Sequence, residues 1–487
     1  MKNIKKITIF LTLILFVLIF FACPNPVNNP VKVTNPYNNI QQSLSENFGP
    51  DESWTFMIYI DADNNLEANA LDDIREMKSG LNGLGNSNIN VVVLIDRINE
   101  YSSDPFPETD TDWTGARIYQ INQDNTITKK TDGWFTDGSE INMGDPDTLK
   151  SFINYCKTNY NSVHYALILW NHGGGARSRS INTQDLNQTE KAVCWDDTDN
   201  SDCLYLDEVQ QAISQYFNSS SKLDFLGFDA CLMGMVEIAY EFRDLALVMA
   251  GSMATEWGNG WDYENLFKLM GNNNNNDPKE LGKLVVKTYH DSTTTQTDQT
   301  QVAVDLTKII DLKTAIDSFA IALYNENKKT NIETVRDFSY HFYTDDDEAV
   351  FYPFYDLNDF AYQIYGNSSI FSSYLVDSAN AVIAALSNAV IAAYAGSYYG
   401  NYYGAGSSVK RGLSIFFSRG NLVYNNYSHY AYQYWYTNID IIGMLGSNYP
   451  YGKIDFANSD ADGIVKTWRE LFEFWYDPAN NLTPGSY

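Results

Sequence analysis

The chain contains few histidines and few cysteines, and this limits the chemistry that it can carry. Its 487 residues include five of each. Five cysteines in so long a chain do not form the dense disulfide framework of small secreted domains. No two histidines have the spacing of a metal-binding pair, so we predict no resident metal site of that kind. An imidazole that serves as a catalytic base must be one of His164, His172, His290, His341 and His429.

Basic residues are also scarce. The chain has 32 Lys and Arg against 61 Asp and Glu, and its formal net charge is −29. A surface this acidic repels phosphates, so a nucleic-acid partner is not expected. Hydrophobic residues make up 44% of the chain, as in globular proteins, and the length suggests about two or three domains.

The N-terminus carries a targeting pattern. Three lysines precede the apolar run 7–21, which predicts a secretory signal peptide over residues 1–22. Cys23 follows directly, as in a bacterial lipoprotein cleavage site, so we expect a lipid on this cysteine. The alternatives are an uncleaved anchor, or an ordinary signal with an incidental cysteine. Residues 23–53, rich in Pro, Asn and Ser, would tether an exported protein to the membrane at the cell envelope or surface.

Apolar runs alternate with helical periods from residue 54 to about 310. Alternation of this kind predicts an α/β fold with a mainly parallel sheet and right-handed crossovers. Strands are expected at residues 55–60, 89–95, 117–121 (an edge strand), 165–170, 223–228, 245–250 and 301–306. Helices are expected at residues 66–77, closed by Gly80, at 145–156 and at 206–217.

The pattern changes after residue 310. Longer helical stretches follow at residues 312–324, 357–365 and 375–392, then a strand at 412–417 and a final aromatic helix around Trp468. We therefore expect an α/β domain at 54–310 and a mostly helical or mixed region at 311–487.

Two predicted strand ends carry reactive side chains. Cys231 follows the strand at 223–228, and His172 follows the strand at 165–170. Open α/β sheets bind their ligands at the carboxyl ends of their strands. Each residue alone is more often inert, as a buried core thiol or a turn histidine. Together they predict a cysteine nucleophile with its base, its thiolate favoured by the N-terminus of the following helix.

Three glycines follow His172. Glycines let the backbone approach a substrate closely and turn its N–H groups inward. The N–H groups of Gly173 and Cys231 are therefore predicted to form an oxyanion hole.

Four segments together resemble the clostripain family of cysteine peptidases, within the caspase-like group. They are MIYIDADNNLE at 57–67, WNHGGG at 170–175, FDACLMG at 228–234 and GNGWDY at 258–263. The resemblance covers about residues 54–263. It implies a caspase-like, mainly parallel sheet flanked by helices, with an additional mostly helical C-terminal region. It also implies a cysteine endopeptidase with a His172–Cys231 dyad and no third triad member.

The resemblance further implies cleavage after Arg or Lys. In the family, the Asp two residues before the nucleophile binds the basic side chain, and here it is Asp229. Glu256 is the candidate for a second acid. A buried guanidinium or ammonium group requires a charged partner. The alternative for Asp229 is a structural cap.

Family members often cleave themselves after the His motif. Here the segment 176–192 is polar, and we predict cleavage after Lys191 first and after Arg179 second. An ordinary exposed loop with basic residues is the alternative.

Four aspartates, at positions 196, 197, 199 and 202, lie between Cys194 and Cys203. Clustered carboxylates suit a hard cation, and the family includes calcium-dependent members, so calcium is left open as a cofactor. A solvated acidic turn is the simpler interpretation. A disulfide between Cys194 and Cys203 is also left open. The segment 61–65 resembles the start of a calcium loop but lacks its glycine, and is interpreted as a strand-to-helix turn.

These observations predict an exported, lipid-anchored cysteine endopeptidase that acts on peptides or proteins with a basic residue at the cleavage site. One alternative is an inactive or non-proteolytic surface lipoprotein that binds a ligand through its Tyr-rich C-terminal region. Another is a cysteine amidohydrolase that acts on small amides.

Overall fold

The computed structural model describes residues 53–84, 88–108, 113–131, 133–176, 193–273, 277–342, 353–406, 411–417, 454–457 and 465–476. The predicted signal peptide and lipidation site at Cys23, and the predicted cleavage sites at Arg179 and Lys191, lie outside these residues. No helix within the described ranges is long and apolar enough to cross a membrane.

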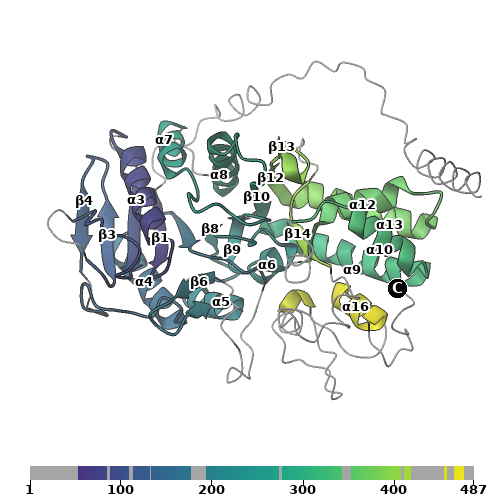
Figure 1. Cartoon of the computed structure of the whole chain (residues 1–487), viewed down its shortest axis with the longest axis horizontal. Helices are drawn as coiled ribbons and strands as arrows, with labels where there is room; N and C mark the ends of the chain where they lie inside the picture. Colours follow the sequence, from purple (N-terminus) through teal and green to yellow (C-terminus); the bar gives the residue numbers. More distant parts are fainter. Residues whose placement is uncertain are drawn as a thin grey trace, which may run out of the picture. The chain divides into compact units, whose positions relative to one another are not determined.

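A ten-stranded sheet forms the centre of the fold (Figure 1). Its five middle strands, from β9 to β2, are parallel, and all pairs outside them are antiparallel. The order is β13 (Tyr402–Ala405), β12 (Val390–Ala395), β10 (Thr300–Asp305), β9 (Ala246–Gly251), β8 (Leu223–Asp229), β5 (His164–Trp170), β1 (Trp54–Ala62), β2 (Ile89–Arg97), β3 (Arg117–Ile121) and β4 (Ile127–Lys130).

Helices cover both faces of this sheet, which explains why the parallel strands are continuous apolar runs. One face carries α3 (Glu67–Leu81), α7 (Tyr263–Asn273) and α8 (Pro278–Ser292) (Figure 1). The other carries α4 (Pro146–Asn159), α5 (Leu206–Ser214) and α6 (Val236–Glu241). Alternate residues of β1 pack into the two cores on either side of the sheet. Phe56 and Ile58 face the core under α3, α7 and α8, and Met57 and Tyr59 face the core under α4, α5 and α6.

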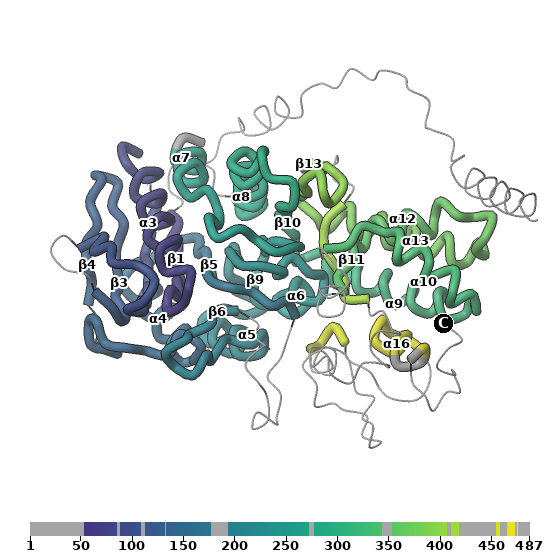
Figure 2. Tube along the Cα trace, in the orientation of Figure 1, coloured from purple at the N-terminus to yellow at the C-terminus, as the bar shows by residue number. Residues whose placement is uncertain are grey.

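The chain after β10 forms a helical region and then returns to the sheet (Figure 2). The helices before this return are α9 (Ile309–Glu326), α10 (Lys329–Phe338), α12 (Leu357–Gly366) and α13 (Ser373–Ala389). β12 and β13 then extend the sheet beside β10, and α16 (Trp468–Tyr476) follows later in the chain. The expected domain boundary at residues 310/311 stays a prediction.

A second, short sheet braces the turn after Cys231. Its strands are β11 (Phe354–Asp356) and β14 (Ser414–Phe416). The Ser414 N–H donates to the carbonyl oxygen of Gly234 at 3.0 Å. The Phe416 N–H donates to the buried Glu237 of α6 at 2.9 Å. Residues far along the chain therefore hold the segment that follows the predicted nucleophile.

The α/β fold class with its mainly parallel sheet is confirmed, but several local predictions are wrong. β3 is not an edge strand, because β4 pairs outside it. Gly80 does not close its helix but lies inside α3, where a Cβ would be 2.6 Å from the carbonyl oxygen of Glu264. The run 375–392 is not one helix, since α13 ends at Ala389 and Val390 begins β12. Short apolar runs do not distinguish a strand from a buried helix.

Candidate active site

The register of two parallel strands places the predicted nucleophile and base together. Trp170 of β5 pairs with Asp229 of β8, so His172 and Cys231 each lie two residues beyond a shared pair. Both residues line one pocket of about 70 Å³. Its other lining residues are Leu66, Trp170, Asn171, Asp229, Ala230, Glu256, Trp257, Gly258 and Gly260. The pocket thus contains both predicted catalytic residues and both predicted substrate-binding acids.

Gly173 brings the two motifs into backbone contact. A Cβ on this residue would lie 2.1 Å from the carbonyl oxygen of Cys231, so only glycine fits without a shift of the backbone. The N–H groups of Gly173 and Cys231 both lie close enough to the Cys231 sulfur to lower its pKa. The two predicted oxyanion donors are therefore beside the predicted nucleophile.

The surroundings of the Cys231 sulfur favour the protonated thiol. The Glu256 N–H donates to the sulfur at 3.1 Å, but burial dominates and raises the pKa of Cys231 to about 11. The predicted help from a helix N-terminus is wrong, because α6 begins only at Val236, beyond the reach of its dipole. Attack by this sulfur consequently needs a base to remove the proton.

Asn65 and Trp195 both contact the imidazole of His172. Its Nε2 lies 2.7 Å from Oδ1 of Asn65, which belongs to the turn between β1 and α3. Its ring packs against Trp195 of β6 (Val193–Asp196), with 5.0 Å between centroids and 32° between planes. Both neighbours were missed in the sequence, although Asn65 lies within the segment 57–67 that carries the family resemblance.

The acids at the base of the pocket are deeply buried. Asp229 accepts hydrogen bonds from the Tyr263 hydroxyl (2.8 Å) and the Trp261 N–H (3.2 Å), and burial raises its pKa to about 7. Neither carboxylate oxygen of Glu256 has a hydrogen bond of normal geometry within the described ranges. Burial, followed by the charge of Asp229, raises the pKa of Glu256 well above its usual value. Interactions with Ala230 and Tyr289 lower this pKa in part.

A third acid, Asp73 of α3, was missed in the sequence. Its Oδ2 accepts a hydrogen bond from Nε1 of Trp170 at 2.6 Å. A Cβ on Gly260 would lie 2.9 Å from Oδ1 of Asp229 and 3.1 Å from Oδ2 of Asp73, so both carboxylates flank this glycine. Burial, then Asp229, raises the pKa of Asp73 well above normal. Asp73 lies on the apolar face of α3, between Ala70 and Met77, and an acid at such a position is the feature of the sequence that could have identified it.

A separate group of carboxylates lies at the turn after β1. Oxygen atoms of Asp63, Asp96 and Glu140 approach within 4.8 Å of one another, as do those of Glu140, Asp196 and Asp199. Burial raises the pKa of both Glu140 and Asp196 to about 7. The interpretation as a solvated acidic turn is therefore wrong for Asp196, which is fully buried.

Two smaller expectations about this region are resolved. Cys194 and Cys203 are both buried, and no disulfide joins them. The segment 61–65 leads from the end of β1 into a strand-to-helix turn, as predicted, since β1 ends at Ala62 and α3 begins at Glu67.

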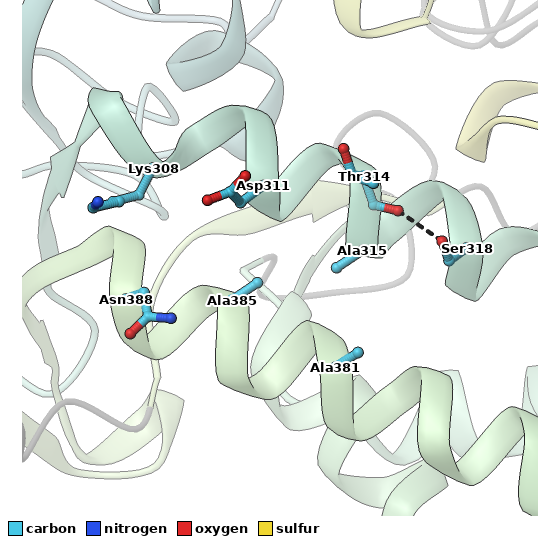
Figure 3. Close-up of a pocket in the computed structure, with 8 residues that line it drawn as sticks. All are labelled: Lys308, Asp311, Thr314, Ala315, Ser318, Ala381, Ala385 and Asn388. Atoms are coloured by element: carbon cyan, nitrogen blue, oxygen red, sulfur yellow. Dashed lines mark hydrogen bonds between the residues drawn. The ribbon is translucent and has the colours of Figure 1, made fainter.

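A larger hollow of about 580 Å³ lies between α9 and α13 (Figure 3). It is lined mainly by small side chains, with Lys308 and Asp311 at one end. It contains no cysteine or histidine, so it is not the predicted site.

Fold and pocket together define a cysteine peptidase of the caspase-like class. The model of the clostripain family matches residues 58–446, and clostripain of Hathewaya histolytica is 35% identical over 513 residues, covering 94% of each chain. The chain therefore belongs to the clostripain family and is a cysteine endopeptidase.

Solved structures show the same fold. An inactive zymogen C11 protease from Parabacteroides distasonis has a TM-score of 0.52 at 20% identity, covering 76% of this chain and 93% of its own. A secreted C11 cysteine protease from Bacteroides thetaiotaomicron, in complex with an irreversible peptide inhibitor, has a TM-score of 0.53 at 17% identity, with coverages of 79% and 96%.

Proposed function

We propose that this endopeptidase cleaves after Arg or Lys, with Cys231 as nucleophile and His172 as base. The observation that carries the proposal is the Trp170–Asp229 register, which brings thiol and imidazole to one pocket above buried acids. In the first step, His172 takes the thiol proton and the sulfur attacks the scissile carbonyl carbon. The N–H groups of Gly173 and Cys231 stabilise the resulting oxyanion. His172 then protonates the leaving amine, and water hydrolyses the thioester.

The buried acids support specificity for a basic side chain. Asp229, Glu256 and Asp73 form no salt bridge with a lysine or arginine in the described part of the chain. Buried carboxylates without a cationic partner are costly, so they become protonated or acquire a partner. A substrate Arg or Lys head group supplies that partner. Asp229 and Glu256 line the pocket and would contact the head group. Asp73 does not line the pocket; it lies beside Gly260 and Trp170 and would act on the head group through its charge.

Three further features of the proposal concern residues outside the described ranges. We expect export, a lipid on Cys23, and self-cleavage after Lys191 or Arg179. The similar protease from Bacteroides thetaiotaomicron is a secreted protein, which agrees with export. Intact mass and N-terminal sequencing of the purified protein test all three, because each event changes the mass by a known amount. An uncut chain beginning at Met1 would contradict them.

Calcium dependence, implied by the family resemblance, stays a prediction for this chain. The residues that fit the ion are Asp63, Asp96, Glu140, Asp196 and Asp199, because they offer only oxygen atoms, as calcium prefers. Burial disfavours the charge on most of these carboxylates, and a bound cation would stabilise it. A bound ion would link β6 and the turn that follows it to the turn after β1.

The test uses Cys231→Ala and His172→Ala variants with an amide substrate that ends in arginine. Both variants should lose hydrolysis, and an arginine-ending thiol-reactive inhibitor should label the wild-type chain at Cys231. Cys203→Ala is the control, because this buried thiol does not line the pocket. Activity in the Cys231→Ala variant would identify a different nucleophile. Turnover of a small amide, with none of peptides, would favour an amidohydrolase.

A further inference from the structure

The segment 252–257, which follows β9, borders the sulfur of Cys231 and the residue after it. The Glu256 N–H donates to the sulfur at 3.1 Å. The N–H of Leu232 donates to the carbonyl oxygen of Ala254 at 2.9 Å. The segment 252–257 is therefore in direct contact with the predicted nucleophile and with the turn that carries it, although 25 positions separate Glu256 from Cys231 along the chain.

Leu232 has a backbone conformation that depends on such support. Its φ is 64°, in the left-handed region that residues other than glycine rarely adopt. A conformation of this kind persists only where the surrounding structure enforces it. The side chain of Leu232 is buried, and its N–H is bound to Ala254. The turn after the nucleophile consequently requires the segment 252–257 to stay in place.

Gln299 and Thr300, at the start of β10, hold this segment through its main chain. Oγ1 of Thr300 accepts hydrogen bonds from the N–H groups of Met253 (3.0 Å) and Ala254 (2.9 Å). Oε1 of Gln299 accepts one from the N–H of Trp257 at 3.4 Å. Gln299 and Thr300 are both fully buried. Main-chain groups on both sides of the N–H that contacts the sulfur are thus bound by these two residues.

The hydroxyl of Thr300 uses its full hydrogen-bonding capacity. A hydroxyl has two acceptor lone pairs and one proton. Both lone pairs receive main-chain N–H groups, so Thr300 donates its proton to Oγ of Ser252, 2.9 Å away. Ser252 in turn shares its own proton between the carbonyl oxygens of Ala254 and Thr300, each at 3.0 Å. Valine has the shape of threonine but lacks the oxygen, so it would leave two buried N–H groups without their acceptor.

We propose that Thr300 is a positioning residue for catalysis: its hydroxyl holds the segment 252–257 so that the Glu256 N–H donates to the Cys231 sulfur and stabilises the thiolate. The proposal rests on the proposed function, because it requires Cys231 to be the nucleophile. A hydrogen bond to an ionised acceptor is about twice as strong as one to a neutral acceptor, so the N–H favours the thiolate over the thiol. When the S–H bond breaks, its electron pair stays on sulfur and the proton passes to His172. The Glu256 N–H and the Thr300 hydroxyl keep their protons throughout.

Alkylation of the thiol by iodoacetamide tests the proposal without a substrate, because the thiolate is the form that reacts. Burial raises the pKa of Cys231 to about 11, so at pH 8 the thiolate fraction falls about tenfold for each further unit. We expect Thr300→Val to raise this pKa by about one unit, and mass spectrometry of the peptide with Cys231 should show about tenfold slower alkylation. Thr300→Ser keeps the hydroxyl and should stay within about twofold of the wild-type rate. The kcat for an arginine amide substrate should fall in parallel in Thr300→Val and recover in Thr300→Ser.

Thr55→Val is the matched control. Thr55 is equally buried, and its Oγ1 donates to the carbonyl oxygen of Tyr160 at 2.9 Å. It lies near the start of β1, at the opposite edge of the parallel strands from Cys231, so this variant should alkylate at the wild-type rate. Equal slowing in Thr300→Val and Thr55→Val would overturn the proposal, as would equal slowing in Thr300→Val and Thr300→Ser. An unchanged or faster rate in Thr300→Val would overturn it as well.

The variants leave the charges around the sulfur unchanged. The titratable groups near it are the carboxyl groups of Glu256 and Asp229, the Tyr289 hydroxyl and the imidazole of His172. Each of these groups is retained in every variant, so a change in the alkylation rate reports on the position of the Glu256 N–H.

A second variant keeps the test decisive if Thr300→Val does not fold. Ser252→Ala removes the acceptor of the Thr300 proton and leaves the Thr300 oxygen in place. Its alkylation should be at least about threefold slower, which corresponds to about half a pKa unit, and an unchanged rate would overturn the proposal. If the wild-type protein cleaves no peptide, the proposed function fails, whereas the alkylation rates still decide whether Thr300 positions the Glu256 N–H.

Discussion

Trp170 and Asp229 are paired across β5 and β8, and the Trp170 indole is bonded to Asp73, which flanks Gly260 together with Asp229. One strand pair therefore aligns the two catalytic candidates and also joins two acids from different parts of the chain. The proposed catalytic residues and the proposed specificity acids are therefore positioned by the same strand pair.

Asp73→Asn should weaken the binding of basic substrates without affecting the chemical step. The amide oxygen still accepts the Trp170 hydrogen bond, so the substitution removes the ability to carry a negative charge and little else. We expect KM for arginine substrates to rise about tenfold, equivalent to about 1.4 kcal/mol, with kcat nearly unchanged. Asp72→Asn is the control, because Asp72 is exposed on the same helix and pairs with Arg75. Equal KM values for the two variants would show that Asp73 does not contribute.

Binding of basic substrates should improve as pH rises through 7. Burial raises the pKa of Asp229 to about 7, so a fraction of the free enzyme carries a neutral carboxyl at neutral pH. A cationic substrate favours the charged carboxylate and must displace that proton. We expect KM for arginine substrates to fall between pH 6 and pH 8, whereas KM for a neutral substrate changes little. A parallel pH dependence for both substrates would contradict this explanation.

Asp229→Asn should stabilise the free chain at pH 8. A carboxyl whose pKa is raised on folding contributes stability below its unfolded pKa, near 4, and this contribution is lost as pH rises through 7. The asparagine side chain of the variant is neutral at every pH, so the variant does not lose stability in this way. Thermal unfolding should therefore show a higher Tm for the variant at pH 8, by several degrees, and a smaller difference at pH 5. A lower Tm for the variant at pH 8 would indicate that the carboxylate has a cationic partner.

Gly173→Ala should impair catalysis strongly. The added Cβ would lie 2.1 Å from the carbonyl oxygen of Cys231, which forces the His and Cys segments apart. A displacement of about 1 Å at the reacting groups reduces kcat by up to about 100-fold. Gly133→Ala is the control, because a Cβ there meets no atom within 4 Å. Wild-type activity in Gly173→Ala would show that the two segments adjust freely.

Removal of calcium should lower the thermal stability of the chain if the carboxylates around Glu140 hold the ion. A ligand at 100 times its Kd adds about 2.7 kcal/mol to the native state, which a chelator reverses. Glu140 belongs to both acidic groups, so Glu140→Gln should abolish the difference in Tm between calcium and chelator. Asp197→Asn, an exposed neighbour, should retain it. An identical Tm with calcium and with chelator in the wild type would exclude this site.

The sequence predicts much of the fold because the central strands are buried on both faces. Continuous apolar runs end at Trp170 and Phe228, so the position of His172 and Cys231 beyond parallel strands follows from local pattern alone. Such reasoning fails for β12, where Val390 follows a helix without a break in hydrophobicity.

The missed site residues act through neighbours that are distant in sequence. Asp73 resembles any polar residue of an amphipathic helix, and only the Trp170 indole, 97 positions away, marks its role. Asn65 contacts an imidazole 107 positions away. Single-sequence patterns contain no information on such pairs.

The hydrogen bond from Ser414 to Gly234 has a consequence for biosynthesis. A growing chain emerges N-terminus first, so the turn that follows Cys231 lacks its brace until residue 414 has left the ribosome. This turn therefore reaches its full set of contacts only after most of the chain has been synthesised, and a product truncated before residue 414 would lack this hydrogen bond.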